Sequence, residues 1–212
     1  ATATISESGN NPAAVVQANP TAGFSIVAYT GTQAAGTIAH GLGAVPKMMI
    51  FKNRAVDGNG WIVYHAGNTA APETDFLFLD NTNTTADNAN RFNDTAPTNS
   101  VFTLGADANI NDDGVACIGF IFAEVEGYSK FGSYTANGLA DGTFVNLGFR
   151  PAFVMLKNTS NNTNGGNWVM MDDTRLGDDV GAINPILSHI TANTNAAEFD
   201  SASYPLADFL SN

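Results

Sequence analysis

The sequence contains few residues that could crosslink or charge the chain. Cys117 is the only cysteine among 212 residues, so an intrachain disulfide is excluded. Charged residues make up 13% of the chain, about half of the usual share in soluble domains. Eight Lys and Arg against 20 Asp and Glu give a formal net charge of -12. Because such a surface repels phosphate and anionic lipid, we expect no binding to nucleic acid or to a membrane.

Long apolar runs are also missing. The longest apolar stretch, Val115 to Ala123, is far shorter than the ~20 residues of a membrane-spanning helix. The polar residues are mostly neutral: the chain has 25 Asn, 21 Thr and 21 Gly, three residue types of low helix propensity. Hydrophobic residues still make up 44%, enough to build a core. The composition therefore predicts an all-β fold with a neutral polar surface.

Two stretches of the chain resemble each other. Residues 24–53 read FSIVAYTGTQAAGTIAHGLGAVPKMMIFKN, and residues 128–158 read YSKFGSYTANGLADGTFVNLGFRPAFVMLKN. At a shift of 105 residues, the matched pairs are Tyr29 and Tyr134, Gly43 and Gly148, Pro46 and Pro151, and Lys52-Asn53 and Lys157-Asn158. Trp61 and Trp168 follow, two residues out of step. A period of this length suits two small domains or lobes, so the sequence predicts an internal duplication.

Each copy contains short segments rich in aromatic and β-branched residues, bounded by Gly, Pro, Asn and Asp, as β-strands are. In the first copy these segments are Phe24–Tyr29, Met48–Lys52, Trp61–His65, Phe76–Leu79, Val101–Leu104 and Val115–Ala123. In the second copy they are Lys130–Tyr134, Thr143–Leu147, Ala152–Lys157 and Trp168–Met171. Only Asn184–Ile190 differs, because its Asn-Pro step predicts one helical turn. Strands at this spacing predict two related β-sandwich-like lobes.

The repeat divides the chain into three parts. Residues 1–22 form a polar, Ala-rich N-terminal arm that we expect to be flexible, residues 23–126 the first β repeat and residues 127–212 the second. The second repeat has no counterpart of the apolar strand Val115–Ala123. A sandwich without a core strand exposes an edge and an apolar face. We therefore expect the strand to come from Ala13–Gln17, from a neighbouring subunit or from residues outside this sequence.

The motifs resemble a known family in their order and spacing. FSIVAYTGT, HGLGAVPKMMIFKN, FAEVEGYSKFGSYTANG and NWVMMD are similar to an uncharacterised repeat domain of tail and other virion proteins of tailed phages, often marine ones, over residues 23–212. The resemblance implies a structural or receptor-binding role at the surface of an extracellular virion. Its implied partners are other virion subunits, including copies of the same chain. It carries no catalytic assignment and no cofactor.

Aromatic residues at matched positions are candidates for a glycan site. Trp61, Trp168, Tyr29 and Tyr134 could stack on the sugars of a host surface glycan if they are exposed beside Asn and Asp side chains. The alternative is burial in the core, because Trp is usually well buried and Trp61 lies in a segment that alternates like a strand with two covered faces. Of the two interpretations, we favour burial.

A turn rich in Asn and Asp is a candidate for a cation site. Its alternating oxygen-bearing residues are Asp107, Asn109, Asn111 and Asp113. The EF-hand pattern fails, because Asp112 replaces the glycine of the sixth position and Ile118 the glutamate of the twelfth. A turn in which Asn and Asp side chains bind the local backbone explains the same residues, and metal binding remains the alternative.

Residues of catalytic type follow no pattern that a reaction requires. Asp172-Asp173 and Asp178-Asp179 could act on a glycoside, but adjacent residues of a strand point to opposite faces. His40, His65 and His189 lie at no metal-ligand spacing, and neither HExxH nor GxSxG occurs. We predict a non-enzymatic tail-fibre, receptor-binding or capsid-decorating module. A carbohydrate-binding adhesion module and, less favoured, a glycan depolymerase are the alternatives.

Overall fold

The computed structural model of the chain describes residues 2–139, 141–161, 166–175, 186, 188–200 and 207–210. Strands account for 37% of the chain and helices for 6%, which confirms the predicted all-β fold. The chain forms two compact units. The first comprises Ala1–Leu79 and Thr85–Ser133, and the second comprises Asp80–Thr84 and Tyr134–Asn212. No helix among the described residues is long and apolar enough to span a membrane.

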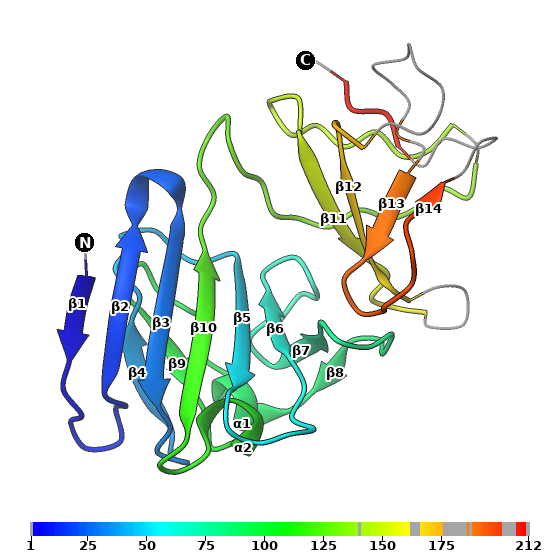
Figure 1. Ribbon diagram of the computed structural model, residues 1–212. Helices are drawn as coiled ribbons and strands as arrows, with labels where there is room; N and C mark the ends of the chain where they lie inside the picture. Colours follow the sequence, from blue (N-terminus) through cyan, green and yellow to red (C-terminus); the bar gives the residue numbers. More distant parts are fainter. Residues whose placement is uncertain are drawn as a thin grey trace. The chain divides into compact units, whose positions relative to one another are not determined.

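The first unit is built on an eight-stranded antiparallel sheet, coloured from blue to green in Figure 1. Its strands, in their order across the sheet, are β1 (Thr2–Ile5), β2 (Ala14–Asn19), β3 (Phe24–Thr30), β10 (Ala116–Phe122), β5 (Met48–Asn53), β6 (Ile62–His65), β7 (Asp75–Phe78) and β8 (Ala86–Asp87). The last strand of the unit along the chain, β10, therefore lies in the middle of the sheet, where it pairs with both β3 and β5.

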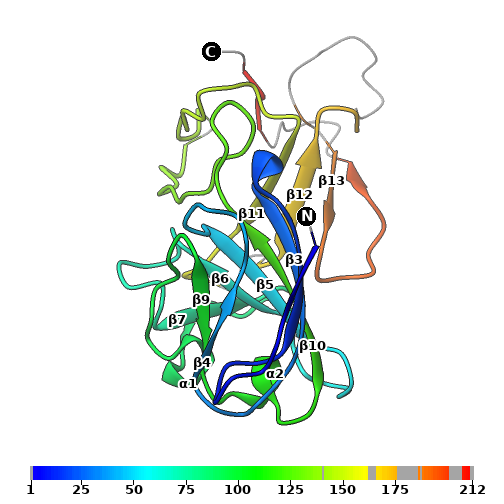
Figure 2. The same ribbon diagram turned by 90° about the vertical axis from the view of Figure 1, so that its left-hand side faces the viewer.

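A second layer covers one face of this sheet. It consists of the strand pair β4 (Gly36–Ala39) and β9 (Val101–Leu104) and the short helices α1 (Ala89–Phe92) and α2 (Ala108–Asn111). Figure 1 and Figure 2 both show β4 and β9 on the same side of the sheet. Between the layers, the ring of Phe51 lies 6.0 Å from that of Phe92 and 5.4 Å from that of Phe102, measured between centroids. The unit is thus sandwich-like, with an aromatic core.

The N-terminal residues belong to the first sheet and do not form the flexible arm predicted from the sequence. β2 pairs with β3 along its whole length, from Ala14↔Tyr29 to Asn19↔Phe24. Val16 is only 3% exposed, so β2 contributes to the core. The 3-10 turn Pro20–Ala22 follows and is capped by the side chain of Asn19. Ala13–Gln17 is therefore not the source of a strand for the second unit.

The second unit contains a four-stranded antiparallel sheet, with β11 (Phe153–Lys157), β12 (Trp168–Asp172), β13 (Ser188–Thr191) and β14 (Phe199–Asp200) in that order. The helical turn predicted over Asn184–Ile190 is wrong where the structure describes it, because β13 begins at Ser188 and pairing with β12 outweighs the local signal. Asn184, Pro185 and Leu187 lie outside the described residues. The strands predicted at Lys130–Tyr134 and Thr143–Leu147 are also absent, since neither segment has a partner strand.

The meander β5–β8 of the first unit and the meander β11–β14 of the second share one register. In each, the residue before the lysine pairs with the residue after the tryptophan: Phe51 with Ile62, and Leu156 with Val169. The next two strand pairs agree as well. Ile62↔Phe78 of the first unit corresponds to Val169↔Thr191 of the second. Two residues back along the third strand, Phe76↔Ala86 corresponds to His189↔Phe199. Four strands of one unit therefore correspond to four strands of the other, pair by pair.

Candidate functional site

The Lys-Asn pair that both copies contain organises the loop after the first strand of the meander. In the first unit, Asn53 Oδ1 accepts hydrogen bonds from the backbone N–H groups of Ala55 (3.1 Å) and Val56 (3.2 Å). Lys52 Nζ donates to the backbone carbonyl of Asn59, two residues before Trp61. Both side chains therefore hold the hairpin loop in place.

The second unit uses the same contacts. Asn158 Oδ1 accepts from the backbone N–H groups of Ser160 (3.1 Å) and Asn161 (3.0 Å). Lys157 Nζ donates to the backbone carbonyl of Gly166, again two residues before the tryptophan. Burial lowers the pKa of Lys157. The shared motif is therefore structural in both units, and its lysines are engaged by the protein itself.

The four aromatic candidates for a glycan site are not alike. Tyr29 is 4% exposed and Trp168 is 3% exposed, so neither can present a ring to a sugar: for these two residues the glycan interpretation is wrong, and burial, the favoured interpretation, agrees with the structure. The hydroxyl of Tyr29 donates to the carbonyl of Ile110, and burial raises the pKa of Tyr29. Tyr134 is 49% exposed in the second unit. Only Trp61 and Tyr134 keep an accessible face.

Trp61 is half-buried at the end of the Lys52 loop. Its ring stacks on Phe120 of β10 with a centroid distance of 6.4 Å. Lys52 Nζ lies 5.9 Å from the centroid of the Trp61 ring. This arrangement leaves part of an aromatic surface open beside polar loop residues, as a sugar-stacking site requires.

The predicted cation site is a structural turn around α2. Asp107 caps this helix, and its Oδ1 accepts from the backbone N–H and the side-chain Nδ2 of Asn109, both at 2.8 Å. Asn111 is fully buried, where its Nδ2 donates to the carbonyls of Ala34 (2.8 Å) and Gly105 (2.6 Å). Asp113 is exposed. Among the described residues, no three His, Cys, Asp or Glu side chains gather as metal ligands. The turn interpretation therefore fits the structure, and the metal interpretation does not.

Two of the carboxylates considered for glycoside cleavage, Asp172 and Asp173, pair with arginines. Asp172 accepts from the Thr174 hydroxyl at 2.7 Å and the Arg175 backbone N–H at 2.7 Å. The pKa of Asp172 is lowered, first by the hydrogen bond from the Thr174 hydroxyl and then by those from the backbone N–H groups of Arg175 and Thr174 and by the charge of Arg175. A general acid needs a raised pKa instead. Asp173 pairs with Arg150 at 3.2 Å. Asp178-Asp179 lies outside the described residues.

The histidines and the cysteine have structural surroundings. His40 is fully buried, with Nδ1 accepting from the Leu42 N–H and Nε2 hydrogen-bonded to the Thr98 carbonyl, both at 3.2 Å. Burial lowers the pKa values of His40, His65 and His189. Burial also raises the pKa of Cys117 to about 11, so its thiol is protonated at neutral pH and a poor nucleophile.

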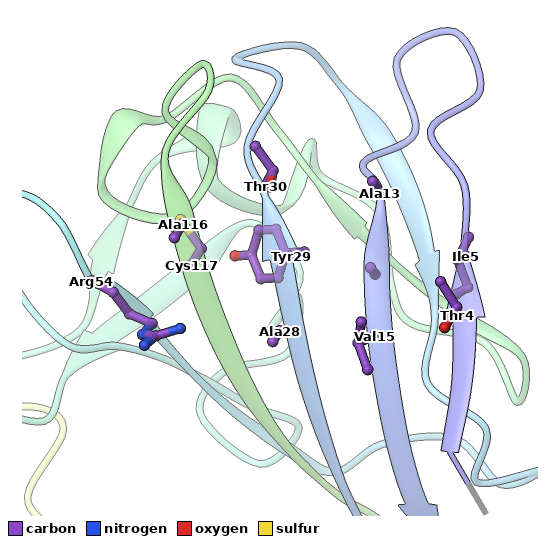
Figure 3. A pocket seen from close by; sticks show the side chains of 11 residues that line it. Thr4, Ile5, Ala13, Val15, Ala28, Tyr29, Thr30, Arg54, Ala116 and Cys117 are labelled. Atoms are coloured by element: carbon purple, nitrogen blue, oxygen red, sulfur yellow. The ribbon is translucent and has the colours of Figure 1, made fainter.

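A shallow depression of about 310 Å³ lies on the outer face of the first sheet, over β1, β2, β3 and β10 (Figure 3). Its lining is dominated by small side chains, among them Thr4, Val15, Ala28 and Ala116. Arg54 stands at one side and is the only charged residue of the lining. It is exposed and forms no ion pair with any described residue. The depression can hold a small group by shape and charge.

Sequence reasoning missed one buried ion. Arg91 is 5% exposed, and its guanidinium carbon lies 3.8 Å from the ring centroid of Phe76 and 5.5 Å from that of Phe78. Its Nη1 lies 3.7 Å from Asp107 Oδ1. The only local signal is the position of Arg91 one residue before the core residue Phe92 in a short helix.

Comparison with known proteins leads to one family. No curated protein and no solved structure matches the chain. A family described as a domain of unknown function (DUF7483) matches residues 1–212. Because this match covers the whole sequence, the chain belongs to the DUF7483 family.

Proposed function

We propose that this chain is a non-enzymatic structural module of a bacteriophage virion: a tail-fibre, receptor-binding or capsid-decorating subunit at the particle surface. The observation that carries the proposal is the matched use of Lys52 and Lys157, each of which fixes a loop of its own unit. The polar residues that both copies share therefore maintain a framework. We further propose that the two units arose by duplication of one β-meander, which agrees with their common register.

The surface chemistry supports a role in attachment or assembly. Only 13% of the residues are charged, and Asn and Thr are abundant. Such a surface binds through shape and neutral hydrogen bonds, which depend weakly on ionic strength. Partners are then other virion subunits, among them copies of this chain.

The proposal is tested on purified particles of the phage that encodes the chain. The particles are banded in a density gradient, and the chain is quantified by mass spectrometry against a known capsid protein. A virion subunit remains with the infectious band at a fixed ratio to the capsid protein, whereas the replication polymerase of the same phage, as control, is removed. Recovery of the chain only in the soluble lysate would overturn the proposal.

Carbohydrate binding is a second candidate, favoured by the partial exposure of Trp61, whose ring stacks on Phe120. A glycan array probed with the full chain and with Trp61→Ala tests this function. Loss of a glycan signal in the variant, with an unchanged circular dichroism spectrum, supports it. The matched control is Tyr128→Ala, which removes an exposed ring that is not a candidate for the glycan site and should leave the signal unchanged. An array without signal for the unmodified chain dismisses this candidate.

A further inference from the structure

We propose that the second unit receives a β-strand from a different polypeptide on the free edge of β11. In the sheet of this unit, β11 is an edge strand with β12 as its one neighbour among the described residues. The matching strand of the first unit, β5, has neighbours on both sides, β6 and β10. The inference rests on the register of the two units and does not depend on the virion role.

The first unit shows how a strand pairs with the edge that corresponds to the free edge of β11. β10 runs antiparallel to β5, with Phe120 opposite Ile50 and Ile118 opposite Lys52. Lys157 is the counterpart of Lys52, so residues 153–157 offer the same ladder positions that β10 uses on β5. Among the residues that the structure describes, no strand occupies them. Unpaired N–H and C=O groups along an edge are a template for strand addition.

Large apolar side chains of the second unit are exposed, although their counterparts in the first unit are buried. Tyr134 is 49% exposed, whereas Tyr29 is 4% exposed on β3, which pairs with β10. Phe144 and Ile38 are counterparts because each follows a Gly-Thr step, yet Phe144 is 71% exposed and Ile38 is 1% exposed. Phe153, the first residue of β11, is 56% exposed. The second unit therefore leaves exposed the apolar positions that the first unit covers, and Phe153 places one of them on the edge strand itself.

The chemistry of the missing strand follows from β10. Its sequence ACIGFIF has no charge, and after the exposed Ala116 it alternates buried and half-buried residues. β11 has one charged residue, Lys157, whose ammonium is engaged by the carbonyls of Gly166 and Thr82. The edge therefore offers no free ionic partner, and charge complementarity favours an uncharged apolar strand of about seven residues that runs antiparallel to β11.

The chain itself offers no spare strand of this kind among the described residues. β3 and β10 are uncharged and seven residues long, but each is already paired on both edges. A second copy could lend either one only by opening its own sheet. β1 has a free edge, but it spans four residues and places Thr2 and Thr4 at alternate positions. No strand among the described residues can therefore be lent without breaking an existing pairing, and we assign the added strand to a different protein.

The test uses the full chain and a synthetic peptide with the β10 sequence, residues 115–122 with Cys117→Ser and two added lysines at each end. Hydrogen exchange is followed by mass spectrometry. We expect the peptide to slow exchange over residues 153–157 by roughly tenfold or more. A control peptide that also carries Ile118→Pro and Phe120→Pro cannot form the ladder and leaves exchange unchanged.

A pair of variants distinguishes binding at the edge of β11 from non-specific binding of the peptide. Phe153→Lys places a charge at an exposed position of the edge, and we expect roughly fivefold weaker peptide affinity. Val56→Lys, at a position 40% exposed in the first unit, leaves affinity unchanged. Equal effects of both peptides or of both variants would overturn the proposal. Slow exchange of residues 153–157 before any peptide is added would also overturn it. If the protein is then a monomer, the chain covers the edge itself; if it is a dimer, a second copy covers the edge.

Discussion

The guanidinium carbon of Arg91 lies over the ring of Phe76, 3.8 Å from its centroid, inside the first unit. Nε and Nη1 of Arg91 have no hydrogen-bond partner among the residues that the structure describes, and Oδ1 of Asp107 is 3.7 Å from Nη1. Burial lowers the pKa of Arg91. The arginine thus contributes packing through its stem and its ring contact, while its charge depends on Asp107.

Removing the two partners of this ion pair should have unequal effects on stability. Arg91→Met keeps the apolar stem, and we expect a change in the free energy of unfolding of less than about 1 kcal/mol. Asp107→Asn keeps the cap of α2 but leaves the cation uncompensated, which should cost about 3 kcal/mol. Urea unfolding measures both, with the exposed Asp57→Asn as control. A larger loss for Arg91→Met than for Asp107→Asn would contradict this assignment.

The sequence predicted the strands that carry their own apolar pattern. Met48–Lys52 and Val115–Ala123 correspond to β5 and β10, because aromatic and branched residues bounded by Gly, Pro or Asp form strands in most surroundings. It did not predict β2 at Ala14–Asn19, which has no aromatic residue and is fixed by pairing with β3. It also predicted a strand at Lys130–Tyr134 that does not form, since strand formation there depends on a distant partner.

At the candidate sites too, features set by local sequence could be predicted, and features set by distant residues could not. The turn interpretation of Asp107 followed from the local hydrogen bonding of Asx side chains, and the structure contains those bonds. The burial of Tyr29 and Trp168 was open from the sequence, because exposure depends on which segments cover a strand. Arg91 could not be found at all, since its partners Phe76 and Phe78 belong to another element.

The loop lysines should stabilise the two units to a similar degree. Lys52→Met and Lys157→Met keep the length of the side chain but remove the hydrogen bond to the loop carbonyl, and each should cost about 1–2 kcal/mol. Lys47→Met is the control, because Lys47 is half-buried but its ammonium forms no hydrogen bond or ion pair with a described residue; it should change stability by less than about 0.5 kcal/mol. Equal stability of all three variants would contradict the structural role of the motif.

The buried hydroxyl of Tyr29 offers a second matched comparison. Tyr29→Phe leaves the carbonyl of Ile110 without this donor in the core, which should cost about 1–3 kcal/mol. Tyr134→Phe makes the same chemical change at the aligned position, which is 49% exposed, and should be nearly neutral. Thermal unfolding of the two variants decides the point. Similar melting temperatures for both would show that the Tyr29 hydrogen bond does not stabilise the fold.

His40 should make the first unit less stable in mild acid. Its pKa is lowered by burial, so the unfolded chain binds the proton first, and stability falls as the pH drops through the ordinary pKa of about 6.5. In the second unit Asn146, one residue out of the 105-residue alignment, accepts from the N–H two residues on, that of Gly148, at 3.0 Å, as His40 does from Leu42. His40→Asn should therefore weaken the loss of stability between pH 7 and pH 5. An unchanged slope in unfolding experiments would assign it to other groups.

The most direct test of the proposed virion role is a reconstruction of the intact particle by electron cryomicroscopy. We predict density that fits the eight-stranded sheet of the first unit at symmetry-related positions on the tail or the shell. A second protein should supply the strand beside Phe153–Lys157. A particle reconstructed at side-chain detail, with every surface density assigned to other proteins and none left for this chain, would contradict the proposal.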